Sequence, residues 1–298
     1  MNSAHSLTVF VTGGSGFVGT AVVGELLERG HHVIATTREL SSRLRMAPNL
    51  RWIAWDVVND PVPELDWTRV QVALHLAAPE KLFDFPRQAA HIYELTVAAT
   101  FRLLETARNL GVGRVLVAST GDVLGSNERP GSEDDVLYLP TSFYGTAKAC
   151  AELLTRSYQS VLSTAILRFY HPYGPGGQRF LINRLVRSVT EEQEIRIEGE
   201  DGITLNPVWI DDLARGVCLA VESSQEGVFH FAGPETVSLR ELVELIGGVV
   251  NKNPIVRSES RPCIQRHAGA FERSSQILGY RPRMTLRDGI RRLSDTMA

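Results

Sequence analysis

A glycine-rich turn near the N-terminus is the feature that most constrains this fold. The apolar run at residues 7–12 leads into the segment GGSGFVG, where Gly13, Gly16 and Gly19 recur every third residue. The run is typical of a buried parallel strand, and the residues after it, up to position 29, have helical spacing. A strand, a glycine turn and a helix in this order can hold a pyrophosphate at the helix N-terminus. The alternative is a simple tight turn between two packed elements.

Short apolar runs alternate with helical patterns through the first half of the chain. This alternation predicts an α/β fold, a Rossmann-type doubly wound parallel sheet with helices on both faces. The expected strands are 7–12, 33–37, 51–55, 72–77, 114–118 and 164–168, and the expected helices lie near 16–29, 87–110 and 143–159. After a rigid turn cluster at 171–177, the elements become shorter and less regular. The polar segment 125–140 is expected to be an ordered surface loop.

Composition narrows the range of partners. The 298 residues carry 31 basic and 34 acidic side chains, without a basic stripe that would suggest nucleic acid. No apolar run is long enough to span a bilayer, and residues 1–6 lack a signal-peptide pattern. The widely spaced Cys150, Cys218 and Cys263 suggest neither a metal site nor a disulfide framework. We therefore expect a cytoplasmic protein that binds no metal, membrane or nucleic acid.

A second motif points to chemistry at the carboxyl end of a strand. Tyr144 and Lys148 are four residues apart, so on a helix they share one face. A pair with this spacing is also common on solvated helix surfaces. Here, however, it follows Ser119 and Thr120, which come directly after the apolar run 114–118. A hydroxyl at a strand end, with a phenol and an ammonium on the next helix, is the arrangement of a hydride-transfer site.

With these motifs, the chain resembles the extended branch of the short-chain dehydrogenase/reductase superfamily, the NAD-dependent epimerase/dehydratase family. The resemblance covers nearly the whole sequence. Its motifs lie at residues 12–19, 75–78, 120 with 123–125, 144 with 148, 167–176 and 208–212. It implies a dinucleotide-binding domain at 1–170, to which 204–232 returns, a substrate-binding lobe formed by 171–203 and 233–298, and a homodimer built through two long helices per subunit.

The choice of cofactor is expected to depend on the end of the second strand. Where relatives that use NAD carry an acid, this chain has Thr37, followed by Arg38 and, a short turn later, Arg43. A guanidinium can grip a 2′-phosphate, so we favour NADP(H), with NAD(H) possible if both arginines are merely solvated. Asp56 matches an adenine contact of the family, or it caps a turn. The resemblance implies cofactor contacts from Gly13, Ser15, Gly16, Phe17, Val18, Gly19, Arg38, Arg43, Asp56, Val57, Leu76, Ala77, Ala78, Lys148 and Tyr170.

The resemblance also implies the catalytic roles. Tyr144 would be the general acid and base, Thr120 would orient the reacting oxygen, and Lys148 would bind the nicotinamide ribose. Lys148 is also expected to lower the pKa of Tyr144. A fall of about three units needs roughly 4 kcal/mol, which an ammonium about 4 Å away supplies at an effective dielectric constant near 20.

Three positions depart from the family pattern. Thr96 stands where relatives usually have an asparagine, which puts any relay role of that side chain in doubt. Gly121 stands where dehydratases carry an acid, which disfavours a 4,6-dehydratase. Asp122 could act as a base, but a carboxylate that caps a turn is the preferred interpretation.

The substrate pocket is the least constrained part. Leu205 stands where relatives have a phosphate-binding arginine, whereas Arg261 matches another such arginine. The candidate substrate contacts are Thr120, Asp122, His171, Arg179, Arg184 and Arg261. The leading hypothesis is NADP(H)-dependent reduction of a keto group on a sugar-type substrate, probably nucleotide-linked. The alternatives are a nucleotide-sugar epimerase that retains its cofactor and a dinucleotide-sensing binding protein.

Overall fold

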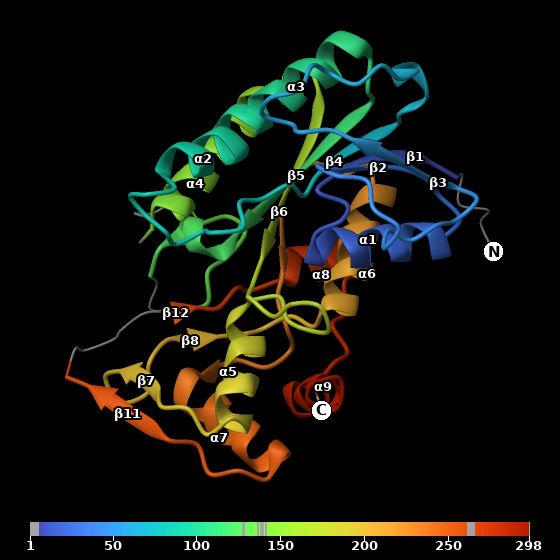
Figure 1. The fold of residues 1–298 in the computed structure, drawn as a ribbon. Helices are drawn as coiled ribbons and strands as arrows, with labels where there is room; N and C mark the ends of the chain where they lie inside the picture. The colour runs from blue at the N-terminus through green and yellow to red at the C-terminus, as the bar shows by residue number, and fades with distance from the viewer. Residues whose placement is uncertain are drawn as a thin grey trace.

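Seven parallel strands form the sheet around which the chain is arranged (Figure 1). The structure is a computed structural model that describes residues 6–126, 129–135, 137, 140, 142–260 and 266–297. The strand order is β3-β2-β1-β4-β5-β6-β9, so the topology switches between β1 and β4. The strands are β1 (Thr8–Thr12), β2 (His32–Thr37), β3 (Leu50–Ala54), β4 (Val72–His75), β5 (Arg114–Thr120), β6 (Ser163–Phe169) and β9 (Gly227–Phe231). In sheets of this kind, ligands bind beyond the carboxyl ends of the strands at the switch point.

Helices cover both faces of the sheet, as the sequence pattern predicts. On one face α1 (Phe17–Glu28) packs against α6 (Ile210–Glu222), and on the other α3 (Ala99–Leu110) packs against α4 (Phe143–Ser157) (Figure 1). A short helical turn, η1 (Trp67–Arg69), precedes β4. Another, η3 (Gly121–Leu124), follows β5. This arrangement confirms the predicted fold class.

A smaller C-terminal region sits beside the carboxyl ends of the central strands (Figure 1). Its strands form two small sheets, β10-β8-β12 and β11-β7. Its elements are α5 (Leu181–Thr190), β7 (Ile195–Glu198), β8 (Thr204–Leu205), β10 (Val237–Ser238), α7 (Leu239–Val250), β11 (Val256–Glu259), β12 (Arg266–His267), α8 (Glu272–Ile277) and α9 (Leu286–Asp295). Between them the chain returns through α6 to the main sheet, where β9 pairs with β6.

Two predicted elements differ from the observed ones in an informative way. The strand expected at 114–118 extends to Thr120, because Ser119 and Thr120 continue the pairing with Arg168 and Phe169 on β6. The helix expected at 87–110 is divided into α2 (Ala89–Tyr93), a π-helical segment η2 (Glu94–Ala98) and α3. A π-helical turn inside an α-helix often lies at a functional site.

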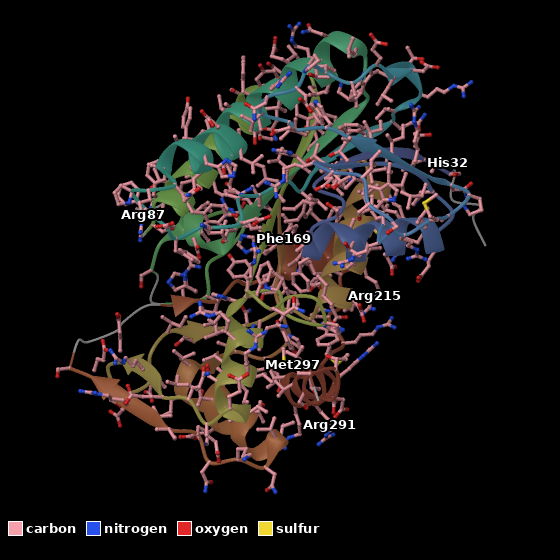
Figure 2. The ribbon with its side chains drawn as sticks, in the orientation of Figure 1. His32, Arg87, Phe169, Arg215, Arg291 and Met297 are labelled. Atoms are coloured by element: carbon pink, nitrogen blue, oxygen red, sulfur yellow. The ribbon has the colours of Figure 1, made fainter. Side chains whose placement is uncertain are left out.

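The hydrophobic core is split by the sheet into two parts. Successive side chains of β1 point to opposite faces, so Val9 and Val11 lie in the α1/α6 core while Phe10 contacts the other. There, the Phe10 ring lies 5.8 Å from Trp55 and 4.7 Å from Trp67, measured between ring centroids. In Figure 2 the labelled Phe169 lies where the main sheet meets the C-terminal region, whereas Arg87 and Arg291 project from the surface.

A fully buried ion pair joins α4 to the sheet. Both Arg168 on β6 and Glu152 on α4 are 0% exposed, and two guanidinium nitrogens donate to the two carboxylate oxygens at 2.9 and 2.7 Å. Ser119 on β5 donates a third hydrogen bond to the same carboxylate, at 2.6 Å. Arg168 also donates to Nε2 of His230 on β9, at 3.2 Å, so the Nδ1 proton of His230 is available to Ala270 O at 2.8 Å.

We predict that Arg168→Met lowers the free energy of unfolding by about 3–5 kcal/mol, because it leaves a carboxylate buried without its partner. A urea titration followed by circular dichroism measures this loss. The matched control is Arg108→Met, since Arg108 makes a similar two-bond pair with Glu105 on the surface of α3. Its effect should be much smaller. Equal losses for the two variants would contradict the importance of burial.

Candidate active site

The glycine turn has the shape needed for a close approach of a phosphate. Gly13 has a φ of +69°, a conformation that L side chains rarely adopt. A Cβ on Gly19 would lie 2.1 Å from the Gly13 carbonyl oxygen, so this position also excludes a side chain. The turn therefore has the cradle, and α1 the N-terminus, that fit a dinucleotide pyrophosphate.

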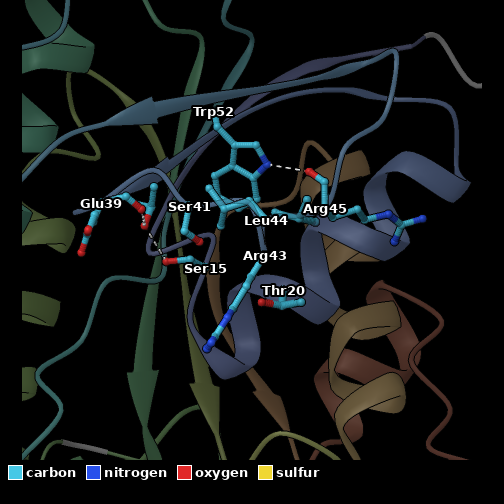
Figure 3. Close-up of a pocket in the computed structure, with 10 residues that line it drawn as sticks. Ser15, Thr20, Glu39, Ser41, Arg43, Leu44, Arg45 and Trp52 are labelled. Atoms are coloured by element: carbon cyan, nitrogen blue, oxygen red, sulfur yellow. Dashed lines mark hydrogen bonds between the residues drawn. The ribbon is translucent and has the colours of Figure 1, made fainter.

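A cavity of about 310 Å³ lies beside this turn, at the carboxyl end of β2 (Figure 3). Its lining includes Ser15 from the glycine turn, Thr37 from β2 and Arg43 from the loop that follows. Ser15 donates a hydrogen bond to Thr37 at 3.0 Å, and Thr37 donates to the backbone oxygen of Glu39. In Figure 3 the Arg43 side chain extends toward Thr20 on α1. The lining of the cavity thus includes hydroxyl groups, the arginines Arg43 and Arg45, and Glu39.

Arg38, which was predicted to bind the 2′-phosphate with Arg43, does not line this cavity. Its guanidinium donates to Glu80, in the loop after β4, at 2.7 Å. Glu80 also accepts from Arg179, in the loop after β6, at 2.9 Å. All three side chains are more than half exposed. One carboxylate therefore connects the end of β2 to the start of the C-terminal region.

Other predicted cofactor residues have structural partners. Asp56 accepts hydrogen bonds from Val58 N at 2.8 Å and from Asn59, so its carboxylate stabilises its own turn. Val57 is a core residue, 5% exposed. The Tyr170 hydroxyl lies 3.2 Å from Nδ1 of His230. For Asp56 these bonds agree with the predicted alternative of a capped turn, and the roles of the three residues in cofactor binding stay predictions.

The remaining predicted cofactor residues surround the switch point between β1 and β4. Thr12, at the end of β1, accepts a hydrogen bond from the Ala77 N–H at 3.3 Å, which fixes the segment after β4. Leu76 and Ala78 flank Ala77 in that segment. Phe17 begins α1, ahead of Val18, and its ring packs against Phe180 with 4.7 Å between centroids. These residues border the crevice in which such sheets bind ligands.

The three predicted catalytic residues meet at the carboxyl end of β5. Thr120 is the last residue of β5, and Tyr144 and Lys148 lie on successive turns of α4. Lys148 is 2% exposed and donates to Ala118 O at 2.7 Å. Its ammonium lies 5.8 Å from the centroid of the Tyr144 ring. The helix begins where predicted because Ser142 caps it, accepting a hydrogen bond from Gly145 N at 3.0 Å.

The electrostatics of this group differ from the expectation. Burial and then the Asp122 carboxylate raise the pKa of the Tyr144 phenol well above its usual value. The predicted lowering by Lys148 is therefore wrong for this arrangement, in which the ammonium is held by Ala118 O rather than by the phenol. Burial lowers the pKa of Lys148 to about 8, and the Glu152 carboxylate, one helical turn further on, opposes this fall.

Two buried polar atoms near the crevice were not foreseen. Thr12 Oγ1 accepts from Ala77 N–H and shares a hydrogen bond with Nδ1 of His75 at 2.7 Å, which leaves Nε2 of His75 on the other side of the ring. Within the described residues, this Nε2 and the hydroxyl of Thr96 on η2 have no hydrogen-bond partner. Burial and the charge of Lys148 lower the pKa of His75 to about 3, so the ring is neutral. The sequence analysis named both positions, but it could not show that these two polar atoms are buried without a hydrogen-bond partner.

Asp122 also has surroundings that the sequence did not reveal. Among the described residues, no backbone N–H donates to its carboxylate, so the predicted turn cap is not found there. Its Oδ1 lies 3.3 Å from Nδ1 of His267 on β12, and the His267 ring lies edge-on to His171 at 6.2 Å. Burial would raise the pKa of Asp122, but the hydrogen bond of His267 and the imidazole of His171 hold it below its usual value. A contact across 145 residues leaves no local pattern that could have identified His267.

Of the predicted substrate residues, Asp122 and His171 lie against the same His267 ring, whereas the predicted arginines lie elsewhere. His171 is partly buried, with a φ of +43°. Arg179 is held by Glu80, and Arg184 is exposed on α5. Leu205, which replaces a family arginine, is a core residue with 0% exposure. Arg261 lies outside the described residues.

The described residues contain neither a membrane-spanning helix nor a metal-binding cluster. No helix there is long and apolar enough to cross a membrane. No group of three or more histidine, cysteine, aspartate or glutamate side chains in that part of the chain is arranged to hold a metal ion.

Comparisons with known proteins agree with this geometry. The model of the NAD dependent epimerase/dehydratase family matches residues 9–231. The chain is 26% identical to dTDP-4-dehydro-6-deoxyglucose reductase of Escherichia coli, over 96% of each protein. It is 26% identical to UDP-glucuronic acid decarboxylase 4 of Arabidopsis thaliana, over 95% of this chain and 67% of that protein. The structure of MoeE5 in complex with UDP-glucuronic acid and NAD superposes with a TM-score of 0.83, at 27% identity, covering 97% of this chain and 98% of the other. The chain belongs to the NAD-dependent epimerase/dehydratase family.

Proposed function

We propose that this protein is an NADP(H)-dependent reductase of a ketone on a nucleotide-linked sugar. The observation that carries the proposal is the position of Thr120, Tyr144 and Lys148 at the carboxyl end of β5, in the same sheet whose β2 end carries a cavity lined by Arg43. Relatives of similar length support a nucleotide-sugar substrate, since one of them is a dTDP-4-dehydro-6-deoxyglucose reductase. The exposed apolar side chains of Phe101 on α3 and Leu153 on α4 support a homodimer through these helices.

The residues around the crevice fit a dinucleotide. The glycine turn would hold the pyrophosphate, and Lys148 would hold the nicotinamide ribose. When bound, the nicotinamide would supply the hydride. Arg43 would contact the 2′-phosphate, because its side chain extends along the cavity beside the glycine turn. We assign this role to Arg43 ahead of Arg38, whose guanidinium already has a carboxylate partner.

The protonation states of the site favour the reductive direction. In that direction the ketone oxygen must gain a proton. Burial and Asp122 keep the pKa of Tyr144 high, so the phenol holds its proton until charge develops on the substrate oxygen. Thr120 would hydrogen-bond the same oxygen and hold it against the phenol. The neighbouring ammonium of Lys148 would stabilise the phenolate that remains.

The structure weighs against a dehydratase that uses an acid at position 121. A Cβ on Gly121 would lie 2.3 Å from the Tyr170 ring, so the space for a side chain is filled. An epimerase that retains its cofactor uses the same three catalytic residues. It would consume no NADPH in net terms and would purify with nicotinamide bound, which separates it from a reductase.

We predict that Tyr144→Phe lowers the turnover of NADPH-dependent ketone reduction by about 10²–10⁴-fold, because the proton donor is lost. The probe is dTDP-4-dehydro-6-deoxyglucose, with NADPH oxidation followed by absorbance. The affinity for NADPH should change little, since the ribose contact belongs to Lys148. A variant that keeps more than about half of the activity would exclude Tyr144 as the acid.

We expect Arg43→Ala to weaken NADPH binding about tenfold or more while it spares NADH, because a charge-assisted bond contributes about 1.5–3 kcal/mol. Calorimetric titration with both cofactors measures the difference. Arg69→Ala is the control, since Arg69 is an exposed arginine on η1 that does not line this cavity. Equal affinity of the unmodified protein for NADH and NADPH would refute the choice of cofactor.

The affinity for NADPH should also depend on pH through Lys148. With a pKa of about 8, the side chain loses its proton as the pH rises. If the ammonium binds the ribose, the dissociation constant should increase about tenfold between about pH 7 and about pH 9. In Lys148→Met this dependence should disappear. A pH dependence that persists in the variant would assign it to another group.

A further inference from the structure

One exposed carboxylate joins three loops at the carboxyl edge of the main sheet. Glu80, in the loop after β4, accepts a hydrogen bond from Arg38 at 2.7 Å and another from Arg179 at 2.9 Å. Arg38 directly follows β2, and Arg179 lies in the loop between β6 and α5. The hydrogen bond from Arg179, and then that from Arg38, hold the pKa of Glu80 below its usual value, so the carboxylate is ionised at neutral pH. We call these three side chains the ionic clasp.

The ionic clasp spans the part of the sheet where the cofactor crevice is expected. In the strand order, β2 and β6 stand on opposite sides of β1, β4 and β5. Ligands of such sheets bind beyond the carboxyl ends of the strands at the switch point, which here lies between β1 and β4. A link from the loop after β2, through the loop after β4, to the loop after β6 therefore crosses this switch point. The glycine turn, which follows β1, lies within the span.

The loop after β6 also lies directly against the N-terminus of α1. The Phe180 ring packs on the ring of Phe17, the first residue of α1, with 4.7 Å between centroids. A Cβ on Gly177 would lie 2.8 Å from the Phe17 ring, so the absence of a side chain lets the loop backbone approach this closely. Arg179 thus reaches Glu80 from a loop that already contacts the helix end expected to hold the pyrophosphate.

The attachments of this loop differ in how easily they can break. At its start the buried Asn183 donates to Gly174 O at 2.7 Å and accepts from the Gly174 N–H at 3.3 Å. The side chains of Arg38, Glu80 and Arg179, in contrast, are 67%, 52% and 70% exposed. Exposed ion pairs add little to the stability of a fold, because water can solvate the separated charges. The ionic clasp can therefore open while the start of the loop stays anchored.

We propose that the ionic clasp of Arg38, Glu80 and Arg179 closes over a dinucleotide bound at the glycine turn and slows its release. No covalent step is involved: Arg179 parts from Glu80, the cofactor leaves, and the ion pair forms again. The inference needs a dinucleotide in the crevice, but it does not depend on the reduction of a keto-sugar. It bears on whether the cofactor stays bound between turnovers, which is the property that separates an epimerase from a reductase.

The direction of one effect separates the ionic clasp from a simple effect of charge. A dinucleotide carries negatively charged phosphates, which the carboxylate of Glu80 repels. If Glu80 acted through its charge alone, Glu80→Gln would slow the release of the cofactor. If Glu80 holds the clasp, the same variant should release the cofactor faster, because a neutral amide binds the two guanidinium groups more weakly than a carboxylate does.

The test measures the release of NADPH from the full-length protein by stopped-flow fluorescence, with excess NADP⁺ as the displacing ligand. At about 20 mM salt we expect Glu80→Gln to release NADPH about three to ten times faster than the unmodified protein. The ratio of the two rates should approach one at about 1 M salt, where the screening length falls to about 3 Å. Slower or unchanged release at low salt would overturn the proposal. The same measurement with NADH and NAD⁺ covers a preference for the cofactor that lacks the 2′-phosphate.

The matched control is Glu192→Gln, which changes the net charge of the protein by the same amount. Glu192 is an exposed carboxylate in the C-terminal region, where it pairs with Lys252. This variant should leave the release rate unchanged. An acceleration equal to that of Glu80→Gln would assign the effect to net charge and overturn the proposal.

A double-mutant cycle tests whether Arg179 acts through Glu80. Arg179→Gln alone should speed the release of NADPH, because it removes one of the two ion pairs. In the Glu80→Gln background the same substitution should have little further effect, since its partner is already gone. Equal effects in the two backgrounds would show that Arg179 acts on the cofactor by itself, which would overturn its place in the clasp.

The ionic clasp and the proposed reductase fail in different ways, because release is measured without a keto-sugar. If Glu80→Gln speeds release but the unmodified protein reduces no ketone, the reductase is wrong and the clasp stands. If ketone reduction proceeds but Glu80→Gln does not speed release, the clasp is wrong and the reductase stands. Failure to bind either dinucleotide would overturn both.

Discussion

The buried pair of Arg168 and Glu152 is the interaction on which the geometry of the site depends. It joins α4, which carries Tyr144 and Lys148, to the strand beside β5, which ends at Thr120. Because both side chains are 0% exposed, water cannot solvate one charged group if the other moves away. Through His230 the same guanidinium reaches the backbone at Ala270, so the network extends from the catalytic helix into the C-terminal region.

The charges around Tyr144 are fixed by different parts of the fold. Glu152 favours the protonated form of Lys148, one turn away on α4, while Asp122 favours the protonated form of Tyr144. Ala118 O on β5 holds Lys148, and His267 on β12 holds Asp122. The protonation of these two α4 side chains thus depends on both the main sheet and the C-terminal region.

Local patterns in the sequence identified most of the fold and predicted the candidate catalytic residues. The glycine turn, the apolar runs and the spacing of Tyr144 and Lys148 depend on neighbouring residues, so each leaves a signature that can be read directly. The short-range turn at Asp56 was likewise one of the two interpretations that the sequence offered. The partners of Arg38 and Asp122 could not be read in this way, because Glu80 and His267 reach them from distant segments. The pKa of Tyr144 was misjudged because burial and Asp122 depend on the packed structure.

The carboxylate of Glu80, shared by Arg38 and Arg179, ties the cofactor side of the crevice to the segment that leads into the C-terminal region. As an exposed pair it adds little to stability. Its importance lies in charge balance, since one anion compensates two guanidinium groups that both lie on it. Without Glu80, two like charges from the segments after β2 and after β6 would face each other. The contact that joins these two distant segments would then become a repulsion between them.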